Sequence, residues 1–262
     1  MLALIAGTGD LPVALQSRLH GPHLVCAMAG FTPSIPVDLT FRIEHLGSFI
    51  AALKARGVTQ VCMAGAVRRP PVDPSQIDGP TAPLVPQIQK ALTSGDDGAL
   101  RAIIAIFEAA EIKILAAHEI APGLLPDPGV LTLMQPPLAV AEAAPKGDAS
   151  LADMGVKDAG QACIVTAEEV ILREDANGTD AMIARYKGSD PTTFMMKGPK
   201  PNQDLRADMP VIGLSTAQNI IAAGLAGIVV EAGGVMVMDQ AEVTALFNTH
   251  QKFLWVRPRG GA

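Results

Sequence analysis

Residues 197–210, KGPKPNQDLRADMP, bring cationic, acidic and amide side chains together between two apolar segments. The three prolines disfavour a helix, because proline lacks an amide donor and pushes the preceding residue toward extended geometry. On an extended chain alternate side chains share a face, so Asp204, Arg206 and Asp208 are expected in a row at intervals of roughly 6.5–7 Å. Two carboxylates so placed can hold a hard cation or a reactive water, and the arginine between them can bind a phosphate through two N–H groups.

Lys197, Lys200 and Gln203 add donors that suit phosphate oxygens. The same composition also describes a solvated charged loop with an internal ion pair, and the chemistry of the segment alone does not separate the two interpretations. The segment follows a predicted strand at 193–196 and precedes a predicted helix at 215–223, so neighbouring elements must hold it in place.

The chain begins with an apolar run, residues 2–6, which ends in Gly7-Thr8-Gly9-Asp10 and leads into helical spacing at residues 11–19. This order of strand, glycine turn and helix lets Gly7 and Gly9 bring the backbone close to a phosphate at a helix N-terminus. The third glycine of a dinucleotide fingerprint is absent and Pro12 stands at the start of the helix, so a plain tight turn explains the pattern equally well.

Further apolar runs at 24–30 and 60–67, separated by a predicted helix at 47–56, indicate strands that alternate with helices. Such alternation predicts a parallel sheet, in which ligands bind beyond the carboxyl ends of the strands. Gly65 and the pair Arg68-Arg69 follow a predicted strand end, as Gly7 and Gly9 do, which makes this edge a candidate site for an anionic ligand. A solvated arginine pair is the alternative.

The composition narrows the classes of function. Of the 262 residues 49% are hydrophobic and 3% aromatic, and the formal net charge is −6. An acidic chain argues against nucleic acid as a partner, because affinity for the phosphate backbone needs a basic surface. Cys26, Cys62 and Cys163 lie far apart among apolar residues, so we expect buried thiols and no disulfide or zinc site. The N-terminus does not resemble a leader peptide and no membrane span is evident, so we expect a cytoplasmic protein.

The irregular stretch PGLLPDPG at 122–129 marks the end of a first domain. The fold class is therefore α/β with two domains, residues 1–130 and residues 131–262, and the second contains the charged segment. In the second domain, residues 161–174 indicate two short strands and Asn177-Gly178 a turn, with Thr179 or Asp180 as the N-cap of the next helix.

Eight blocks are distributed along nearly the whole chain. They are IAGTGDLP (5–12), VCMAGAVRRP (61–70), GDDGALR (95–101), AAHEIAPGLL (116–125), DAGQACIV (158–165), NGTDAMIAR (177–185), KGPKPNQDLRADMPVIG (197–213) and AAGLAGIVVEAG (222–233). In content, order and spacing they resemble the LpxI-type UDP-2,3-diacylglucosamine pyrophosphatases, a family earlier known only as a domain of unknown function. The family often has an acidic residue at the position of Asn177 and an alanine at that of Thr8.

The resemblance implies a Rossmann-like N-terminal half and a distinct α/β catalytic C-terminal half. The family hydrolyses UDP-2,3-diacylglucosamine to 2,3-diacylglucosamine 1-phosphate (lipid X) and UMP in lipid A biosynthesis. It does so with a divalent metal such as Mg²⁺, and water attacks the phosphorus on the sugar side. The resemblance also implies a cytoplasmic enzyme with transient contact to the inner-membrane surface. The oligomeric state is left open, a homo-oligomer included.

On this basis Asp204 and Asp208 are expected to hold Mg²⁺ or the attacking water, while Lys200 and Arg206 bind the diphosphate. Gln203 is expected to orient a ribose, a sugar or the water. The other expected substrate-binding residues are Lys197, Thr179, Asp180, Gly7, Gly9 and Arg68.

Met195, Met196 and Met209 flank the charged segment, which makes them candidates for lining an acyl-chain cleft between the domains, although methionines beside a strand are more often core residues. Two other functions remain open. One is a different nucleotide-sugar-processing enzyme, and the other is a protein that binds a UDP-lipid without cleaving it.

Overall fold

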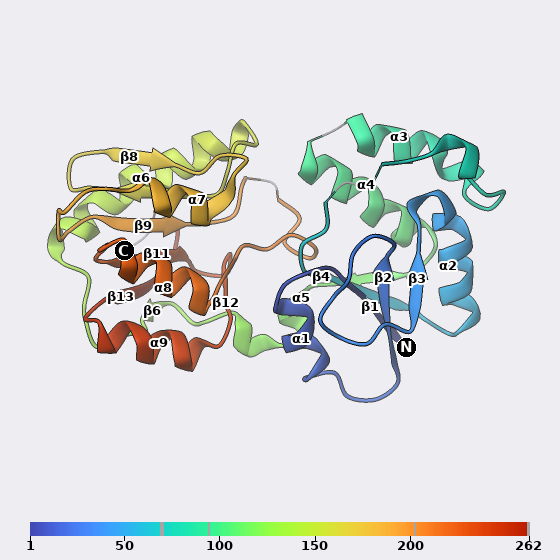
Figure 1. The fold of residues 1–262 in the computed structure, drawn as a ribbon, viewed down its shortest axis with the longest axis horizontal. Helices are drawn as coiled ribbons and strands as arrows, with labels where there is room; N and C mark the ends of the chain where they lie inside the picture. The colour runs from blue at the N-terminus through green and yellow to red at the C-terminus, as the bar shows by residue number, and fades with distance from the viewer. Residues whose placement is uncertain (69–70, 94, 202, 261–262) are drawn as a thin grey trace. The chain divides into compact units, whose positions relative to one another are not determined.

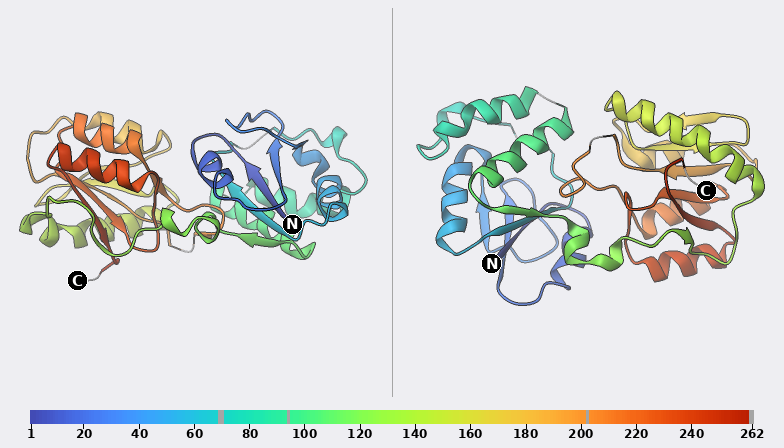
Figure 2. Two further views of the ribbon diagram at one scale, coloured as in Figure 1. Left: turned by 90° about the horizontal axis from the view of Figure 1, so that it is seen from below. Right: turned by 180° about the vertical axis from the view of Figure 1, so that it is seen from behind.

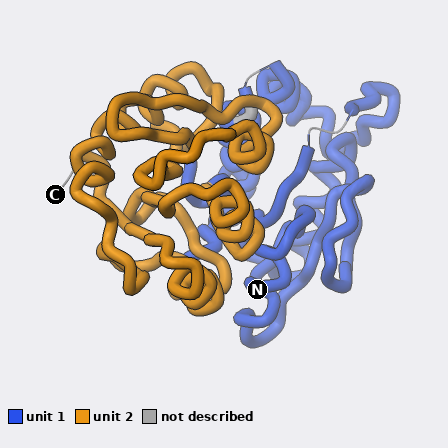
Figure 3. The backbone as a smooth tube through the Cα atoms, turned by 60° about the vertical axis from the view of Figure 1, so that its left-hand side comes forward, with its two compact units in different colours: residues 1–122, 204–208 blue, residues 123–203, 209–262 orange. Residues whose placement is uncertain are grey.

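The computed structural model describes residues 1–68, 71–93, 95–201 and 203–260, which form two compact units (Figure 3). Unit 1 contains residues 1–122 and 204–208, and unit 2 contains residues 123–203 and 209–262. The division therefore falls after residue 122, where the sequence led us to expect 130, and the segment 204–208 belongs to unit 1. Ala207 gives a physical reason for that assignment, because it packs against the hydrophobic core of unit 1.

Unit 1 is built on a five-stranded sheet (Figure 1). Its strands are β1 (Leu2–Ala6), β2 (His23–Met28), β3 (Leu39–Phe41), β4 (Gln60–Ala64) and β5 (Lys113–Leu115). They lie in the order β3-β2-β1-β4-β5, and every neighbouring pair is parallel. This confirms the predicted Rossmann-like parallel sheet. The strand order reverses between β1 and β4, and the crevice at such a reversal is where parallel sheets bind ligands.

The sheet of unit 1 is buried on both faces. The helices of this unit are α1 (Leu11–Gln16), α2 (Leu46–Ala55), α3 (Val85–Thr93), α4 (Asp96–Ala109) and α5 (Ala117–Ile120), with 3₁₀ helices η1 (Ile43–His45), η2 (Pro74–Gln76), η3 (Ala82–Leu84) and, at the boundary, η4 (Pro122–Leu124). Ala3 and Val61 belong to a core cluster with side chains of α2, α3 and α4, whereas Leu4 and Cys62, at alternate positions, are also fully buried. Burial on both faces explains why these strands are continuous apolar runs in the sequence.

Unit 2 contains a six-stranded mixed sheet and a small parallel pair of strands. The large sheet consists of β6 (Gly129–Val130), β7 (Ala162–Val165), β8 (Val170–Arg173), β9 (Phe194–Lys197), β11 (Gly227–Glu231) and β13 (Phe253–Arg257), and the pair of β10 (Val211–Ile212) and β12 (Met236–Val237). The order in the large sheet is β6-β13-β11-β9-β7-β8.

Four strands of this sheet end at one edge. β9, β11 and β13 are mutually parallel, and β8 runs in the same direction because both β8 and β9 are antiparallel to β7. The last residues of these strands are Arg173, Lys197, Glu231 and Arg257. We call this edge of unit 2 the carboxyl edge.

Helices cover both faces of the large sheet of unit 2, as the left panel of Figure 2 shows. They are α6 (Leu138–Val156), α7 (Gly178–Arg185), α8 (Leu214–Ala222) and α9 (Gln240–Thr249). α6 packs on the face that carries Phe194 and Met196, and α7, α8 and α9 pack on the face that carries Met195 and Val230. The predicted second α/β half is confirmed.

Two expectations about the whole chain can be compared with the structure. Cys26, Cys62 and Cys163 are buried free thiols, as predicted, and burial raises the pKa of each to about 12. Within the part of the chain that the structure describes, every helix is too short or too polar to span a membrane.

Candidate active site

The glycine turns after β1 and β4 are joined to each other by backbone hydrogen bonds. Gly7 N–H donates to the Ala64 carbonyl at 2.8 Å, Thr8 N–H donates to the Ala66 carbonyl at 3.0 Å, and Ala66 N–H donates back to the Thr8 carbonyl at 2.9 Å. These two turns follow the strands between which the strand order reverses. The predicted edge is therefore correctly located, but three of its amides already have acceptors.

Two glycines are required for this close approach. A Cβ added at Gly7 would lie 2.5 Å from the Ala66 carbonyl oxygen, and one added at Gly65 would lie 2.7 Å from the Thr8 carbonyl oxygen. Gly9 differs, because it is exposed, has φ of 96° and has open space where its Cβ would be. The tight-turn interpretation thus explains Gly7, and Gly9 stays a predicted contact to the ligand.

Arg68 lies on the loop that follows the turn after β4, and it is exposed. Arg69, its predicted partner, lies outside the described residues. Arg68 keeps the expected position beyond a strand end, and its contact with an anion remains a prediction.

The segment 204–208 forms a turn in place of the expected extended chain. Ala207 N–H and Asp208 N–H both donate to the Asp204 carbonyl at 3.1 Å. The predicted row of three side chains on one face is therefore wrong. The apolar side chain of Ala207 gives the physical reason, because it is partly buried against the core of unit 1 and the chain bends to bring it there.

Arg206 is held by two carboxylates of unit 1. Its Nε and Nη2 donate to the two oxygens of Asp204 at 2.9 and 2.7 Å, and its Nη1 donates to Glu108 of α4 at 2.6 Å. Hydrogen bonding from Arg206 lowers the pKa of Asp204, and bonding to Asp204 and then Glu108 raises that of Arg206. The internal ion pair that the sequence left open is present, and a phosphate has to compete with it for Arg206.

Lys197 is the last residue of β9 and only 7% exposed. Its Nζ donates to Thr179 Oγ1 at 3.1 Å, and that hydroxyl donates to Glu174 Oε1 at 2.5 Å. Glu174 directly follows β8, so these residues meet at the carboxyl edge of unit 2. Two of the predicted residues, Lys197 and Thr179, are thus in direct contact, and Thr179 also binds Glu174, an acid that the sequence did not single out.

Asp180 accepts a hydrogen bond from Asn219 Nδ2 at 2.8 Å. The sequence predicted Thr179 or Asp180 as the N-cap of α7. This prediction is wrong, because the helix already begins at Gly178 and Asn177 is its N-cap. The side chain of Thr179 bonds to Glu174, and Asp180 links α7 to α8.

Lys200 and Gln203 close a turn in unit 2. Lys200 N–H donates to Gln203 Oε1 at 2.8 Å, and Gln203 N–H donates to the Lys200 carbonyl at 3.2 Å. The Lys200 ammonium lies 2.5 Å from Asp158 Oδ1. The side-chain carbonyl of Gln203 therefore has a structural role, whereas the Lys200 ammonium is bound by an acid whose side chain is 40% exposed.

Glu231 and Arg259 fix the beginning of the charged segment, and sequence reasoning did not identify them. Arg259 donates to Glu231 Oε2 at 2.7 Å and to the Pro199 carbonyl at 2.6 Å. Burial raises the pKa of Glu231, and Arg259 opposes that shift. A Cβ at Gly198 would lie 2.8 Å from Glu231 Oε2. Glu231 could have been found in the sequence from its position, because it is the last residue of an apolar strand, and ligands bind beyond the carboxyl ends of such strands.

Comparison with known proteins agrees with this arrangement of two units. The family model of the LpxI N-terminal domain matches residues 1–124, and that of the LpxI C-terminal domain matches residues 127–255. Over 266 aligned residues, which cover 93% of this chain and 92% of the relative, the chain is 33% identical to the UDP-2,3-diacylglucosamine pyrophosphatase LpxI of Caulobacter vibrioides. The chain belongs to the LpxI family. The gap between the two matched domains lies close to the division of the units after residue 122.

The LpxI resemblance implied a divalent metal on Asp204 and Asp208. No group of three or more His, Cys, Asp or Glu side chains among the described residues is arranged to hold one. Mg²⁺ does not require such a group, because it usually takes one or two carboxylates and completes its shell with water and substrate phosphates. The half-buried Asp208 fits that chemistry. Asp204 fits it only after Arg206 has released its two carboxylate oxygens.

The three methionines next to the charged segment in this LpxI family member are buried. Met195 and Met196 lie on opposite faces of the large sheet, one in each core cluster of unit 2, and Met209 is 7% exposed. Their predicted role in lining an acyl cleft is therefore wrong for Met195 and Met196, which are core residues.

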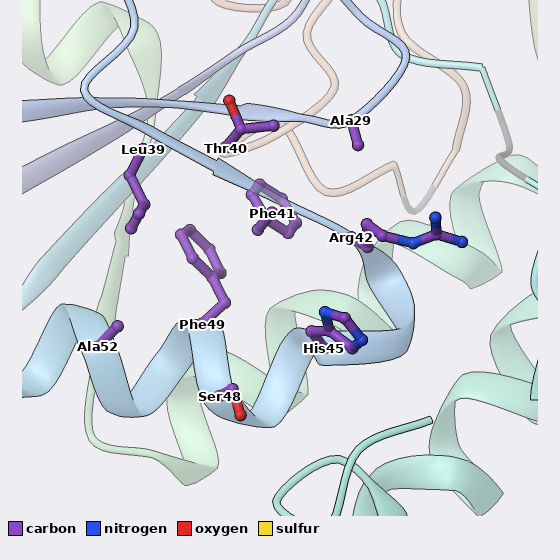
Figure 4. Close-up of a pocket in the computed structure, with 9 residues that line it drawn as sticks. All are labelled: Ala29, Leu39, Thr40, Phe41, Arg42, His45, Ser48, Phe49 and Ala52. Carbon is purple, nitrogen blue, oxygen red and sulfur yellow. The ribbon is translucent and has the colours of Figure 1, made fainter. Parts of the chain in front are cut away.

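Unit 1 has an apolar hollow of about 370 Å³ between β3 and α2 (Figure 4). Phe41 and Phe49, which line it, stack with their ring centroids 3.9 Å apart. Arg42, at the same hollow, pairs with Glu44 at 3.0 Å. The described residues that line the hollow include none of the predicted site residues, so the hollow is separate from the candidate site.

Proposed function

We propose that this chain hydrolyses the diphosphate of UDP-2,3-diacylglucosamine to 2,3-diacylglucosamine 1-phosphate and UMP. The observation that carries the proposal is family membership along both units, together with a relative that bears the name of this pyrophosphatase and aligns over 93% of the chain. The reaction adds one water: its oxygen bonds to phosphorus, the bond from that phosphorus to the bridging oxygen breaks, and the two protons of the water end on phosphate oxygens of the products or in solvent.

The cations of the charged segment suit the substrate side of this reaction. A diphosphate diester carries negative charge that grows on the bridging oxygen as the bond breaks, and fixed cations stabilise it. Lys197, Lys200 and Arg206 are the candidates. Lys200 is paired with Asp158, whose side chain is 40% exposed, whereas at Arg206 a phosphate has to compete with the bidentate bond to Asp204.

Asp208 is our candidate for binding the attacking water or a divalent metal, and Asp204 for orienting Arg206. The metal, when bound, would neutralise phosphate charge and make water more acidic. The Asp208 carboxylate can accept a proton from the attacking water or hold that water by hydrogen bonding. Removal of this carboxylate is therefore expected to affect the chemical step more than substrate binding.

A lipid substrate requires that the enzyme reach the membrane surface at least transiently. We include this contact in the proposal because both acyl chains of the substrate are apolar and have to leave a bilayer or remain partly in it. Flotation of the chain with liposomes that contain the substrate, compared with liposomes that lack it, tests the contact.

The deciding experiment incubates the purified full chain with UDP-2,3-diacylglucosamine and Mg²⁺ in ¹⁸O-labelled water. Release of UMP together with ¹⁸O in 2,3-diacylglucosamine 1-phosphate supports hydrolysis by attack at the sugar-side phosphorus. Intact substrate with tight binding indicates a UDP-lipid binding protein. Turnover of other nucleotide sugars, with no turnover of this lipid, indicates the other nucleotide-sugar enzyme. A parallel reaction in EDTA tests the metal, and full activity there would refute that part of the proposal.

Asp208→Asn is the variant that tests the assigned chemistry. We expect kcat to fall at least about 100-fold, as is typical for loss of a group that acts in the chemical step. Asp127→Asn is a matched control, because Asp127 is exposed and lies outside the charged segment. An Asp208→Asn protein with nearly unchanged kcat would contradict the assignment while leaving the overall function intact.

A further inference from the structure

Glu174 occupies a fixed position at the carboxyl edge of unit 2. It follows the last residue of β8, and its N–H donates to the Ala162 carbonyl of β7 at 2.9 Å. Its carboxylate oxygen Oε2 accepts the Gln161 N–H at 2.7 Å. The main chain and one carboxylate oxygen are thus both held, so the direction of the other oxygen, Oε1, is set by the fold.

The hydrogen bonds from Lys197 to Glu174 have a defined direction. A threonine hydroxyl has one proton, and an ammonium group can only donate. Because Lys197 Nζ donates to Thr179 Oγ1 at 3.1 Å, the Thr179 proton is directed to Glu174 Oε1 at 2.5 Å. The donors therefore run from Lys197 to Thr179 to Glu174. Thr179 then has no proton left for a substrate oxygen, which changes the role expected for it from the sequence.

The hydrogen bonds from Lys197 through Thr179 to Glu174 connect a buried ammonium to a carboxylate of opposite charge. Lys197 is 7% exposed, and a buried ammonium is costly unless it is hydrogen-bonded and near an opposite charge. Glu174 supplies a negative charge one hydroxyl group away from that ammonium.

We infer that Glu174 is a positioning residue that acts through Thr179 to hold the Lys197 ammonium at the place where it binds the substrate diphosphate. The inference rests on the proposed function and goes beyond it, because it adds a residue outside the charged segment. The competing explanation is that Glu174 only anchors the corner between β7, β8 and α7.

A double-mutant cycle separates the two explanations. Glu174→Gln keeps the shape but removes the charge, and Lys197→Met keeps much of the stem but removes the ammonium. We expect Glu174→Gln alone to lower kcat/KM about 10- to 100-fold, the range for loss of a hydrogen bond that involves a charged group. In the Lys197→Met background the same change should have at most about a twofold effect, since interacting residues are not additive. Fully additive losses would overturn the inference.

Variants of Thr179 provide a second test, which does not require the Lys197→Met enzyme to have measurable activity. Thr179→Ser keeps the hydroxyl and should retain near wild-type hydrolysis, whereas the isosteric Thr179→Val should reproduce most of the loss seen for Glu174→Gln. Equal activity of the Ser and Val variants would refute the inference. Glu168→Gln, on the exposed turn between β7 and β8, is the control for the same substitution and should leave the activity unchanged.

The rate of reductive methylation of Lys197, followed by peptide mass spectrometry, is independent of catalysis. We expect this rate to rise at least about threefold in both Thr179→Val and Glu174→Gln, because neither holds the ammonium by a charge-linked hydrogen bond. A wild-type chain that does not cleave the lipid would refute the proposed function, yet the labelling would still test the link to Glu174. Unchanged labelling in both variants would refute the link itself.

Discussion

Gly7→Ala is expected to disrupt the contact between the turns after β1 and β4, whereas Gly9→Ala should leave it intact. The new Cβ at Gly7 would lie 2.5 Å from the Ala66 carbonyl oxygen, where ordinary contact begins at 3.4 Å. Its other close neighbours are main-chain atoms, which cannot rotate away as a flexible side chain can. At Gly9 the added methyl meets open space, and only the φ of 96° is unfavourable.

The loss of stability in Gly7→Ala can be estimated from the overpacking and from the hydrogen bonds that the new methyl group would disturb. Overpacking a tight site costs about 1–3 kcal/mol, and each of the hydrogen bonds between Thr8 and Ala66 contributes about 1 kcal/mol. We therefore expect a loss of local stability of about 2–4 kcal/mol for Gly7→Ala. For Gly9→Ala the cost of the left-handed backbone is about 1–2 kcal/mol, in part offset by the reduced entropy of the unfolded chain.

Amide hydrogen exchange is the suitable measurement, because two units need not unfold together and a single global transition would be ambiguous. Peptides that cover Thr8 and Ala66 should exchange roughly 30- to 1000-fold faster in Gly7→Ala, since 1.36 kcal/mol corresponds to a tenfold change. The reasoning is refuted if Gly7→Ala keeps wild-type protection at these amides. Normal protection together with a raised KM would show that Gly7 serves the ligand.

Three further predictions concern other parts of the chain. Glu44 is nearly fully buried, and hydrogen bonding from Arg42 lowers its pKa from 4.5 to about 2. The stabilisation of the fold by the Glu44 carboxylate should be complete above pH 4.5 and disappear as the pH falls toward 2. Glu44→Gln should therefore lower the free energy of unfolding by roughly 1–3 kcal/mol at pH 7. In urea titrations, its free energy of unfolding should also fall less steeply between pH 4.5 and 2 than that of the wild type. Gly198→Ala should displace Glu231 and lower the rate of hydrolysis about tenfold, while the circular dichroism spectrum stays unchanged. The control Gly213→Ala, whose added Cβ would lie 3.5 Å from its nearest neighbour, should leave the rate of hydrolysis unchanged. Hydrolysis lost in EDTA should return with added Mg²⁺, and a failure to return would argue against Mg²⁺ as the metal.

Buried parallel strands were the part of the fold that the sequence predicted best. β1, β2 and β4 are apolar runs bounded by glycine or polar residues, and their positions differ from the predictions by only a few residues. β3 escaped prediction because it has three residues and none of them is fully buried. β10 and β12 consist of two residues each, so they depend on pairing with each other and have no sequence period of their own.

The charged segment shows why residue types are easier to predict than shape. Proline spacing favoured an extended chain, but the turn at 204–208 is stabilised by Ala207, which packs against the core of unit 1, and by the bond from Arg206 to Glu108. Glu108 lies 98 residues earlier in the chain, and a single sequence contains no signal that links the two. Glu174 and Arg259 were missed for the same reason, since each acts on the site through a contact distant in sequence.

The ion pairs of unit 2 differ in how readily they can give way to a substrate. Arg257 and Asp148 are 2.7 Å apart with side chains 5% and 15% exposed, so separating them would leave a buried charge without its partner. Lys200 and Asp158 are 17% and 40% exposed, so the Asp158 carboxylate has more contact with solvent than the Asp148 carboxylate. We expect a diphosphate to separate Lys200 from Asp158 at a lower cost than Arg257 from Asp148, because water can rehydrate the released Asp158 carboxylate. Burial therefore ranks Lys200 above Arg257 as a cation for the substrate, although both lie at or beyond strand ends of the same unit.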